Sequence, residues 1–178
     1  HVRPRDWSVG ARAYQLLAVS EAISNEYILP YSDPVPNTSQ DPILSIVAAR
    51  GETEPASFVI PSGDRGLEQV AITIDGLKRA GGTEVLPAAA IDLRLVKSWY
   101  QASDSIHRQH GGGKRLVSEL LLHDGDLVRV DHQEQVNLIR NVDRLRDADH
   151  LLPFDVPARS NQQVWISITV PSETPTGR

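Results

Sequence analysis

The densest group of titratable side chains surrounds His123-Asp124-Gly125-Asp126, which Asp131-His132 follows closely, with His107 and His110 upstream. Imidazole and carboxylate groups bind divalent metals, so a metal site is one interpretation. The spacing matches neither the His-Glu-x-x-His motif nor a calcium loop with its closing glutamate. The interpretation that we favour is a polar turn between two strands, because Asp and Gly supply turn geometry without any ligand. We therefore predict no metal site and no other cofactor.

Four carboxylates, at Glu119, Asp124, Asp126 and Asp131, are candidates for the acid and base of glycoside hydrolysis. Such a pair is defined by its separation across a substrate, and chance proximity is expected among 23 acidic residues. The chain contains no Gly-x-Ser-x-Gly elbow and no phosphate-binding glycine motif. It also contains no cysteine, which excludes a thiolate nucleophile. The sequence therefore predicts no catalytic residue in this chain.

Aromatic residues form a third group of interest. Trp99 and Tyr100 are adjacent in a predicted strand, so their side chains project to opposite faces. Trp165 lies opposite the aliphatic row of its own strand. An outward aromatic ring can stack on a sugar or pack against another domain, whereas an inward one fills the core. Our candidate carbohydrate-binding or domain-interface residues are Trp99, Tyr100, Gln101 and Trp165.

The elements that position these residues show strict alternation of apolar and polar side chains. The alternation is clearest in Gln69–Asp75, Ile91–Tyr100 and Val164–Val170. Pro171 ends the last of these strands, because proline has no backbone N–H to donate to a neighbouring strand. Further predicted strands are Tyr14–Val19, Ile43–Ala49, Ala56–Ile60, Leu127–Val130 and Val136–Arg140. About eight strands without crossover helices predict an all-β fold, an antiparallel two-sheet β-sandwich of the jelly-roll kind.

Helical signals are few. We expect one helical turn at Ser118–Leu122, capped by Ser118, and the charged segment Val142–His150 lacks an apolar stripe. Two stretches predict long loops, Pro30–Pro42 and Gln101–Lys114, which includes three consecutive glycines.

Charge and hydropathy narrow the choice of partners. The net charge is −5, and lysine and arginine form no continuous patch, which disfavours nucleic acid. No apolar run approaches the roughly 20 residues that cross a bilayer, and the N-terminus has no apolar signal core. We therefore expect no nucleic acid and no membrane among the partners.

The chain begins without methionine and stops inside the turn Pro171–Arg178. We expect residues 1–42 to be an N-terminal extension with one strand and residues 43–178 to be a β-sandwich domain truncated at its C-terminus. A strand beyond Arg178 would then pair with Val164–Val170. Its loss would leave an open edge and a marginally stable fragment.

Four segments resemble the N-terminal β-sandwich of large bacterial proteins related to glycoside hydrolase family 123. They are Glu52–Ile60, Val96–Ala102, Glu119–Asp124 and Val164–Gly177, and the resemblance covers about residues 43–178. In that family a (β/α)-barrel follows the sandwich and carries the catalytic Asp-Glu pair, to which no residue here corresponds. The resemblance therefore implies a non-catalytic accessory domain whose parent protein is secreted or periplasmic.

Three functions remain open. The leading one is an accessory domain that packs on the catalytic barrel of the same glycan-processing protein and borders its cleft through Gln101–Lys114. A self-standing carbohydrate-binding module would instead use Trp99, Tyr100 or Trp165 to stack on a glycan. A structural or adhesive module would bind no ligand.

Overall fold

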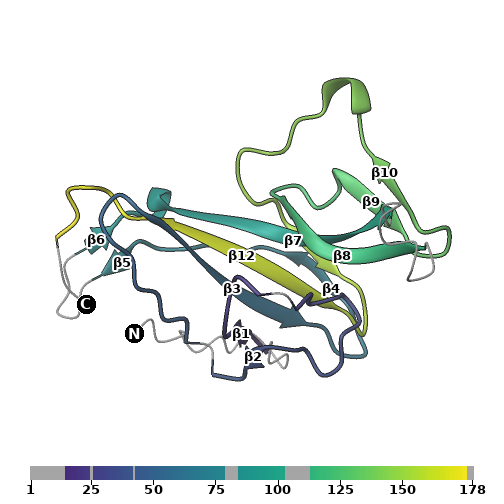
Figure 1. Ribbon diagram of the computed structural model, residues 1–178, viewed down its shortest axis with the longest axis horizontal. Helices are drawn as coiled ribbons and strands as arrows, with labels where there is room; N and C mark the ends of the chain where they lie inside the picture. The colour runs from purple at the N-terminus through teal and green to yellow at the C-terminus, as the bar shows by residue number, and fades with distance from the viewer. Residues whose placement is uncertain (1–14, 25, 42, 79–83, 103–112, 176–178) are drawn as a thin grey trace.

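The computed structural model describes residues 15–24, 26–41, 43–78, 84–102 and 113–175. Its largest unit is a six-stranded sheet in the order β2-β1-β3-β12-β7-β8, with antiparallel neighbours throughout. Figure 1 shows β3, β12 and β7 side by side along the length of the molecule. The strands are β1 (Leu17–Val19), β2 (Thr38–Ser39), β3 (Thr53–Pro61), β7 (Ile91–Ala102), β8 (Lys114–Leu122) and β12 (Asn161–Thr169).

Three small antiparallel sheets complete the described strands. They pair β4 (Leu67–Val70) with β11 (Phe154–Val156), β5 (Leu77–Lys78) with β6 (Glu84–Leu86), and β9 (Val128–Asp131) with β10 (Val136–Ile139). In the described part of the chain, helical structure is limited to the 3-10 turns Ala88–Ala90 and Val142–Arg144. The all-β, antiparallel fold class is confirmed.

The main core lies against one face of the six-stranded sheet. Alternate residues of its central strands are buried there, among them Leu93, Leu95 and Val164, the last with no exposed surface. Phe154 and Val156 of β11 cover them from the other side. The covering layer consists of the β4–β11 and β5–β6 pairs and unpaired segments rather than a continuous second sheet, so a two-sheet sandwich is not confirmed.

The opposite face of the sheet holds a smaller cluster. Leu17 and Val19 of β1 pack there on Val59 of β3 and on Ile28. Strands β1 and β2, which lie in the predicted N-terminal extension, thus form one edge of the six-stranded sheet. The domain boundary at residue 42 stays a prediction.

The strongest alternation in the sequence matches the observed strands well. The predicted strands Ile91–Tyr100, Val164–Val170 and Ala56–Ile60 correspond to β7, β12 and β3. The hairpin of β9 and β10 is likewise where Leu127–Val130 and Val136–Arg140 predicted it. The predicted strand Tyr14–Val19 corresponds to β1, although Tyr14 lies outside the described residues.

Two alternating segments are not strands as predicted. Residues 43–49 form no strand, and Gln69–Asp75 keeps only its first two residues, in β4. Leu44 and Ile46 nevertheless pack on the main core, as do Ile72 and Ile74. Alternation reports which side chains face the core, but it does not report whether a neighbouring strand is within reach of the backbone.

The expectation of an open edge at Val164–Val170 is wrong. Strand β12 is interior, because it pairs with β3 from Asn161 to Thr169 and with β7 from Gln163 to Ile168. Both rows of its backbone hydrogen-bonding groups therefore have partners within the described chain, and no strand beyond Arg178 is needed to complete it.

The predicted helical turn at Ser118–Leu122 is also wrong, because these residues belong to β8. A register shift opposite Lys97 and Ser98 leaves Glu119 as an extra residue in β8 and breaks its alternation. The segment Val142–His150 contains only the 3-10 turn Val142–Arg144.

The two predicted loops have different outcomes. Pro30–Pro42 is irregular apart from the two residues of β2, with Pro42 outside the described residues. Gln101 and Ala102 end β7 and Lys114 begins β8, whereas 103–112 lie outside the described residues. Among the residues that the structure describes, no helix has the length and apolarity to cross a membrane.

Candidate functional site

Three of the predicted site residues, Trp99, Tyr100 and Gln101, occupy the outer end of β7. Strand β12 pairs with β7 only as far as Val96, so the β7 edge beyond it needs other hydrogen-bonding partners. The side chain of Asn137 supplies them, because its amide accepts from Tyr100 N (2.9 Å) and donates to Tyr100 O (2.7 Å). This amide therefore replaces one residue of a neighbouring strand and ties β10 to β7.

Neighbouring side chains contact those of Tyr100 and Gln101. The Tyr100 hydroxyl lies 3.3 Å from Nδ1 of His132, and the two rings meet edge to face. Gln101 donates a hydrogen bond to the carboxylate of Glu119. The indole nitrogen of Trp99 is enclosed and has no hydrogen-bond partner within the described part of the chain. The rings of Trp99 and Tyr100 are both half-buried.

Trp165 lies apart from them, on the face of the sheet opposite the main core. Its register partners are Arg94 of β7 and Ser57 of β3, and its indole nitrogen donates to Ser167 Oγ at 3.2 Å. Trp99 lies five positions after Arg94 along β7, which is roughly 17 Å at the usual strand rise. The structure does not bring Trp165 and Trp99 into one aromatic surface. Their roles in sugar binding or in a domain interface stay predictions.

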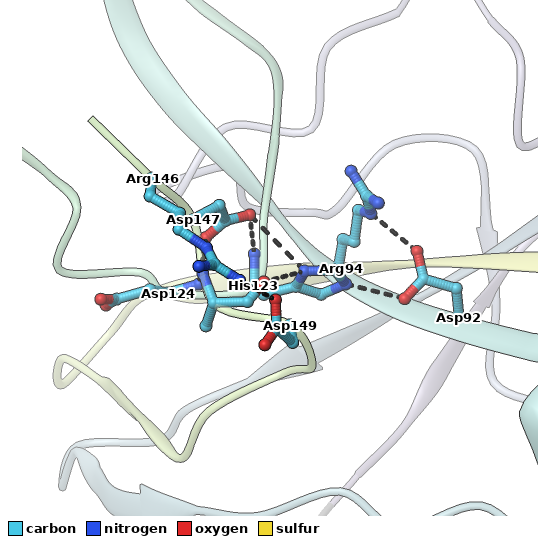
Figure 2. Close-up of polar contacts among 8 residues, drawn as sticks. Asp92, Arg94, His123, Asp124, Arg146, Asp147 and Asp149 are labelled. Carbon is cyan, nitrogen blue, oxygen red and sulfur yellow. Dashed lines mark hydrogen bonds and ion pairs between the residues drawn. The ribbon is translucent and has the colours of Figure 1, made fainter. Parts of the chain in front are cut away.

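The predicted polar cluster contains one closely organised group, centred on His123 (Figure 2). His123 follows β8 directly, and only 8% of its side chain is exposed. Nδ1 donates to the carbonyl oxygen of Ala148 at 2.7 Å, and Nε2 lies 2.7 Å from Oδ1 of Asp92 on β7. Arg94 Nε contacts the other oxygen of Asp92, also at 2.7 Å.

Asp147 fixes the backbone on the other side of His123. Its carboxylate accepts from the backbone N–H groups of His123 (2.8 Å), Asp124 (2.9 Å) and Ala148 (2.9 Å). Leu152 N then donates to His123 O at 3.0 Å. The segment that precedes β11 is thereby fastened to the end of β8, although nearly 25 residues separate the two in sequence.

The pKa values of both carboxylates follow from these contacts. Burial tends to raise the pKa of Asp92, but hydrogen bonds from His123 and Arg94, with the charges of both, hold it below its ordinary value. Burial likewise tends to raise the pKa of Asp147, and its three backbone donors with the charge of His123 lower it overall. Both side chains are therefore ionised at neutral pH.

These contacts give His123 a structural role. Both nitrogens of the imidazole are occupied by protein groups, Nδ1 by the carbonyl oxygen of Ala148 and Nε2 by the carboxylate of Asp92. With only 8% of the side chain exposed, neither nitrogen is open to a substrate. The cluster is a brace between β7, β8 and the segment before β11, and its geometry is unsuited to general-base catalysis.

The remaining carboxylates of the predicted cluster shape turns. Asp124 Oδ1 accepts from Asp126 N at 2.9 Å, and Leu127 N donates to Asp124 O at 3.1 Å, which confirms the turn between β8 and β9. Asp131 Oδ1 accepts from the backbone N–H groups of Gln133 and Glu134 in the next turn. His107 and His110 lie outside the described residues. The described ranges contain no group of three or more His, Asp or Glu residues placed to hold a metal.

The side chain of Lys97 contacts the turn between β8 and β9. Its Nζ donates to Gly125 O at 2.8 Å. Burial lowers the pKa of the Lys97 amine, and the nearby carboxylates of Asp126 and Asp124 oppose that shift. This contact fixes the start of the β9–β10 hairpin on β7.

Sequence reasoning missed the partners of His123 and two surface features. Asp92 could have been suspected from its place beside Arg94 on the polar side of β7, whereas no local pattern connects His123 with Asp147. The missed surface features are the exposed ring of Tyr31 and a run of exposed aliphatic residues between positions 138 and 145.

Comparison with known proteins gives a partial likeness to a solved structure. No family model matches the chain, and no curated protein matches it. A family 123 glycoside hydrolase from Clostridium perfringens, whose structure was solved to study glycolipid glycan hydrolysis, is similar over 73% of this chain with 10% sequence identity and a TM-score of 0.46. The matched part is 17% of the length of that enzyme. The enzyme comes from the family that the four sequence segments resemble, and membership of this chain in that family stays a proposal.

Proposed function

We propose that this chain is a non-catalytic all-β domain of a multidomain glycan-processing protein, and that it packs on the catalytic domain of the same protein. The glycan-processing part rests on the four sequence segments that resemble glycoside hydrolase family 123. The same resemblance supports a secreted or periplasmic parent protein.

One observation carries the packing role. Four aliphatic side chains are exposed within eight positions of β10 and the segment after it, namely Leu138 (44%), Ile139 (40%), Val142 (70%) and Leu145 (58%). Scattered exposed aliphatic residues are ordinary on a soluble domain, whereas several on one projecting hairpin and the segment after it can be covered by a partner. Leu138 and Ile139 are adjacent in β10, so they lie on opposite faces of the hairpin. We call these four residues the hairpin patch.

The position of the hairpin patch suits docking. The β9–β10 hairpin and the following segment stand out from the body at one end of the molecule (Figure 1). The hairpin is held to the sheet by Asn137 and by the contact between Lys97 and Gly125. A patch on a firmly held projection loses little conformational freedom when a partner covers it, which favours binding.

The polar surroundings of the hairpin patch fit the same role. Arg140, Arg144 and Arg146 flank the aliphatic residues, and Arg140 pairs with the carboxylate of Asp124. Interfaces commonly combine an apolar centre with a polar rim, and arginine is enriched in them relative to the rest of the surface. The catalytic domain would cover the four aliphatic side chains and leave the arginines at the margin.

A pair of valine variants tests this function. The partner is the remainder of the protein that the complete gene encodes, produced separately and titrated with this chain. Val142→Asp should weaken binding at least tenfold, because it places a charge in the interface. Val47→Asp is the matched control, since Val47 is 94% exposed and lies on a different segment. Equal binding by both variants, or no binding by the unaltered chain, would overturn the proposal.

A further inference from the structure

An open groove is lined by none of the residues of the hairpin patch. It forms where β1, the segment from Tyr31 to Gln40, and the turns at residues 61–64 and 159–161 meet, and its volume is about 750 Å³. Sites for small molecules commonly measure about 300 to 1,000 Å³. The groove is therefore large enough for a ligand of two or three sugar rings.

Backbone hydrogen bonds hold the walls of the groove in place. Asn161 N donates to Pro30 O (2.6 Å), and its side-chain amide donates to Ser32 O (2.7 Å). On the opposite wall, Ser62 N donates to Ser160 O (2.8 Å) and Arg159 N to Gly63 O (2.9 Å). A frame fixed in this way is preorganised, so little ordering is needed when a ligand binds.

The floor of the groove is apolar and belongs to the smaller core cluster. Leu17 is buried beneath it and packs with Val19, Ile28 and Val59, and Val35 packs against the same cluster. The side chains of the floor are thus held in place by packing within this cluster.

Tyr31 gives the groove an aromatic surface. Its ring is 63% exposed, whereas every other described aromatic residue is buried or half-buried. A tyrosine ring presents a wide apolar face with a hydroxyl at one end, which matches the mixed apolar and hydroxylated surface of a sugar ring. Tyr31 is thus a further candidate for the stacking role that the sequence suggested for Trp99, Tyr100 or Trp165.

Side chains with hydrogen-bonding groups line the same groove as this ring. Gln15, Asp33 and Gln40 line the groove and are exposed. Arg159 and Asp64 form an ion pair at its rim, with Nε and Oδ1 3.0 Å apart and both side chains more than 80% exposed. An exposed pair of this kind contributes little to stability, so its groups can exchange their contact for one with a ligand.

The charge of the groove selects among ligands. Two carboxylates, Asp33 and Asp64, face one guanidinium, that of Arg159, so the lining has a net charge of about −1 at neutral pH. Phosphorylated, sulfated and acidic sugars would be repelled, because recognition of anions depends on an excess of cationic donors. A neutral hydroxylated ligand satisfies carboxylate, amide and guanidinium groups alike.

We propose that this groove binds a neutral carbohydrate, which stacks on Tyr31 and hydrogen-bonds through its hydroxyl groups to Asp33, Gln40 and Arg159. The choice of a carbohydrate rests on the proposed function, whereas the groove and its groups are independent of it. The inference adds a binding site to a domain for which packing alone was proposed.

Titration of the 178-residue chain, followed by ¹⁵N NMR, tests the site. The probes are cellobiose, lactose, chitobiose and mannobiose, with sialyllactose as the anionic comparison. We expect at least one neutral sugar to shift resonances in residues 31–40, 61–64 and 159–161, and sialyllactose to bind at least tenfold more weakly than lactose. Shifts centred on Trp165 or Trp99, preference for the anionic sugar, or no response to any neutral sugar would overturn the inference.

Variants of Tyr31 separate stacking from general surface effects. Tyr31→Ala should lower the affinity at least tenfold, and Tyr31→Phe, which keeps the ring, should change it less than threefold. Tyr31 is exposed, so both variants should keep the melting temperature and the dispersed spectrum of the unaltered chain. Equal affinity of Tyr31→Ala and the unaltered chain would contradict the site.

The docking variant distinguishes this inference from the proposed function. Val142→Asp lies outside the groove and should leave the sugar titration unchanged. Loss of sugar binding with intact docking overturns only the groove, and loss of docking with intact sugar binding overturns only the packing role.

Discussion

Nε2 of His123 lies 2.7 Å from Oδ1 of Asp92, which joins the residue after β8 to the polar side of β7. The same imidazole donates to Ala148 O, so one buried side chain connects three segments. The surrounding groups are Arg94, Asp124 and Asp147 (Figure 2). The His123 brace keeps the segment before β11 against the sheet.

The first prediction concerns the contribution of His123 to stability. His123→Ala should lower the free energy of unfolding by roughly 2 to 4 kcal/mol, because each hydrogen bond to a charged group contributes about 1.5 to 3 kcal/mol. The measurement is urea denaturation at neutral pH. His150→Ala is the matched control, since His150 is exposed, and it should change stability by less than about 0.5 kcal/mol. Similar losses in the two variants would contradict the brace.

The second prediction concerns the stability of the folded protein at low pH. The pKa values of Asp92 and Asp147 are lower in the folded protein than the ordinary value of 3.8, so the unfolded chain binds protons first as the pH falls. Their stabilisation is complete above that ordinary value and disappears as the pH drops through the folded pKa values. The urea midpoint of the unaltered chain should therefore fall as the pH is lowered from about 5 to 2. The midpoint of the Asp147→Asn variant should fall less steeply over the same range. An equally steep fall in the variant would show that the Asp147 carboxylate is not a source of the stability lost in acid.

The third prediction concerns the central position of β12. Each backbone N–H from Gln163 to Ile168 faces either β3 or β7, so consecutive amides should exchange with solvent at similarly slow rates. In an edge strand, every second amide would exchange quickly. Hydrogen exchange followed by NMR distinguishes the two cases. Exchange rates that alternate between fast and slow from one residue to the next along β12 would show that the strand lies at an edge.

The fourth prediction compares two glycines. A Cβ at Gly66 would lie 2.9 Å from Val156 O, a backbone atom of β11 that cannot move alone, so Gly66→Ala should cost about 1 to 3 kcal/mol. A Cβ at Gly63 would meet nothing within 4 Å, so Gly63→Ala should be neutral or slightly stabilising. Thermal denaturation of both variants checks this. Equal melting temperatures would mean that Gly66 and β11 are packed less closely than the structure shows.

Much of the fold follows from side-chain alternation, because burial on one face imposes a period of two on β12 and on Ile91–Leu95 of β7. The prediction failed where that cause is absent. In β8, Leu116 and Val117 are both buried and Glu119 is an extra residue, so the pattern there is typical of neither a strand nor a helix. In residues 43–49 the alternation is genuine, but no strand lies beside the backbone to form a ladder.

The site was less predictable, because long-range contacts define it. The turn at Asp124–Asp126 was predicted, since its geometry is local. The His123 brace depends on Asp92 and Asp147, which lie 31 residues before and 24 residues after the histidine. Tyr31 was placed in a loop, and its exposure becomes apparent only when β1 and the turn at Arg159 form the groove around it.

The fifth prediction tests the central claim most directly. Hydrogen exchange of residues 138–145 is compared between this 178-residue chain and the protein that the complete gene encodes. If the hairpin patch docks on the catalytic domain, these amides exchange at least tenfold more slowly in the complete protein, while β12 is unchanged. Equal exchange of residues 138–145 in the two proteins would contradict the account.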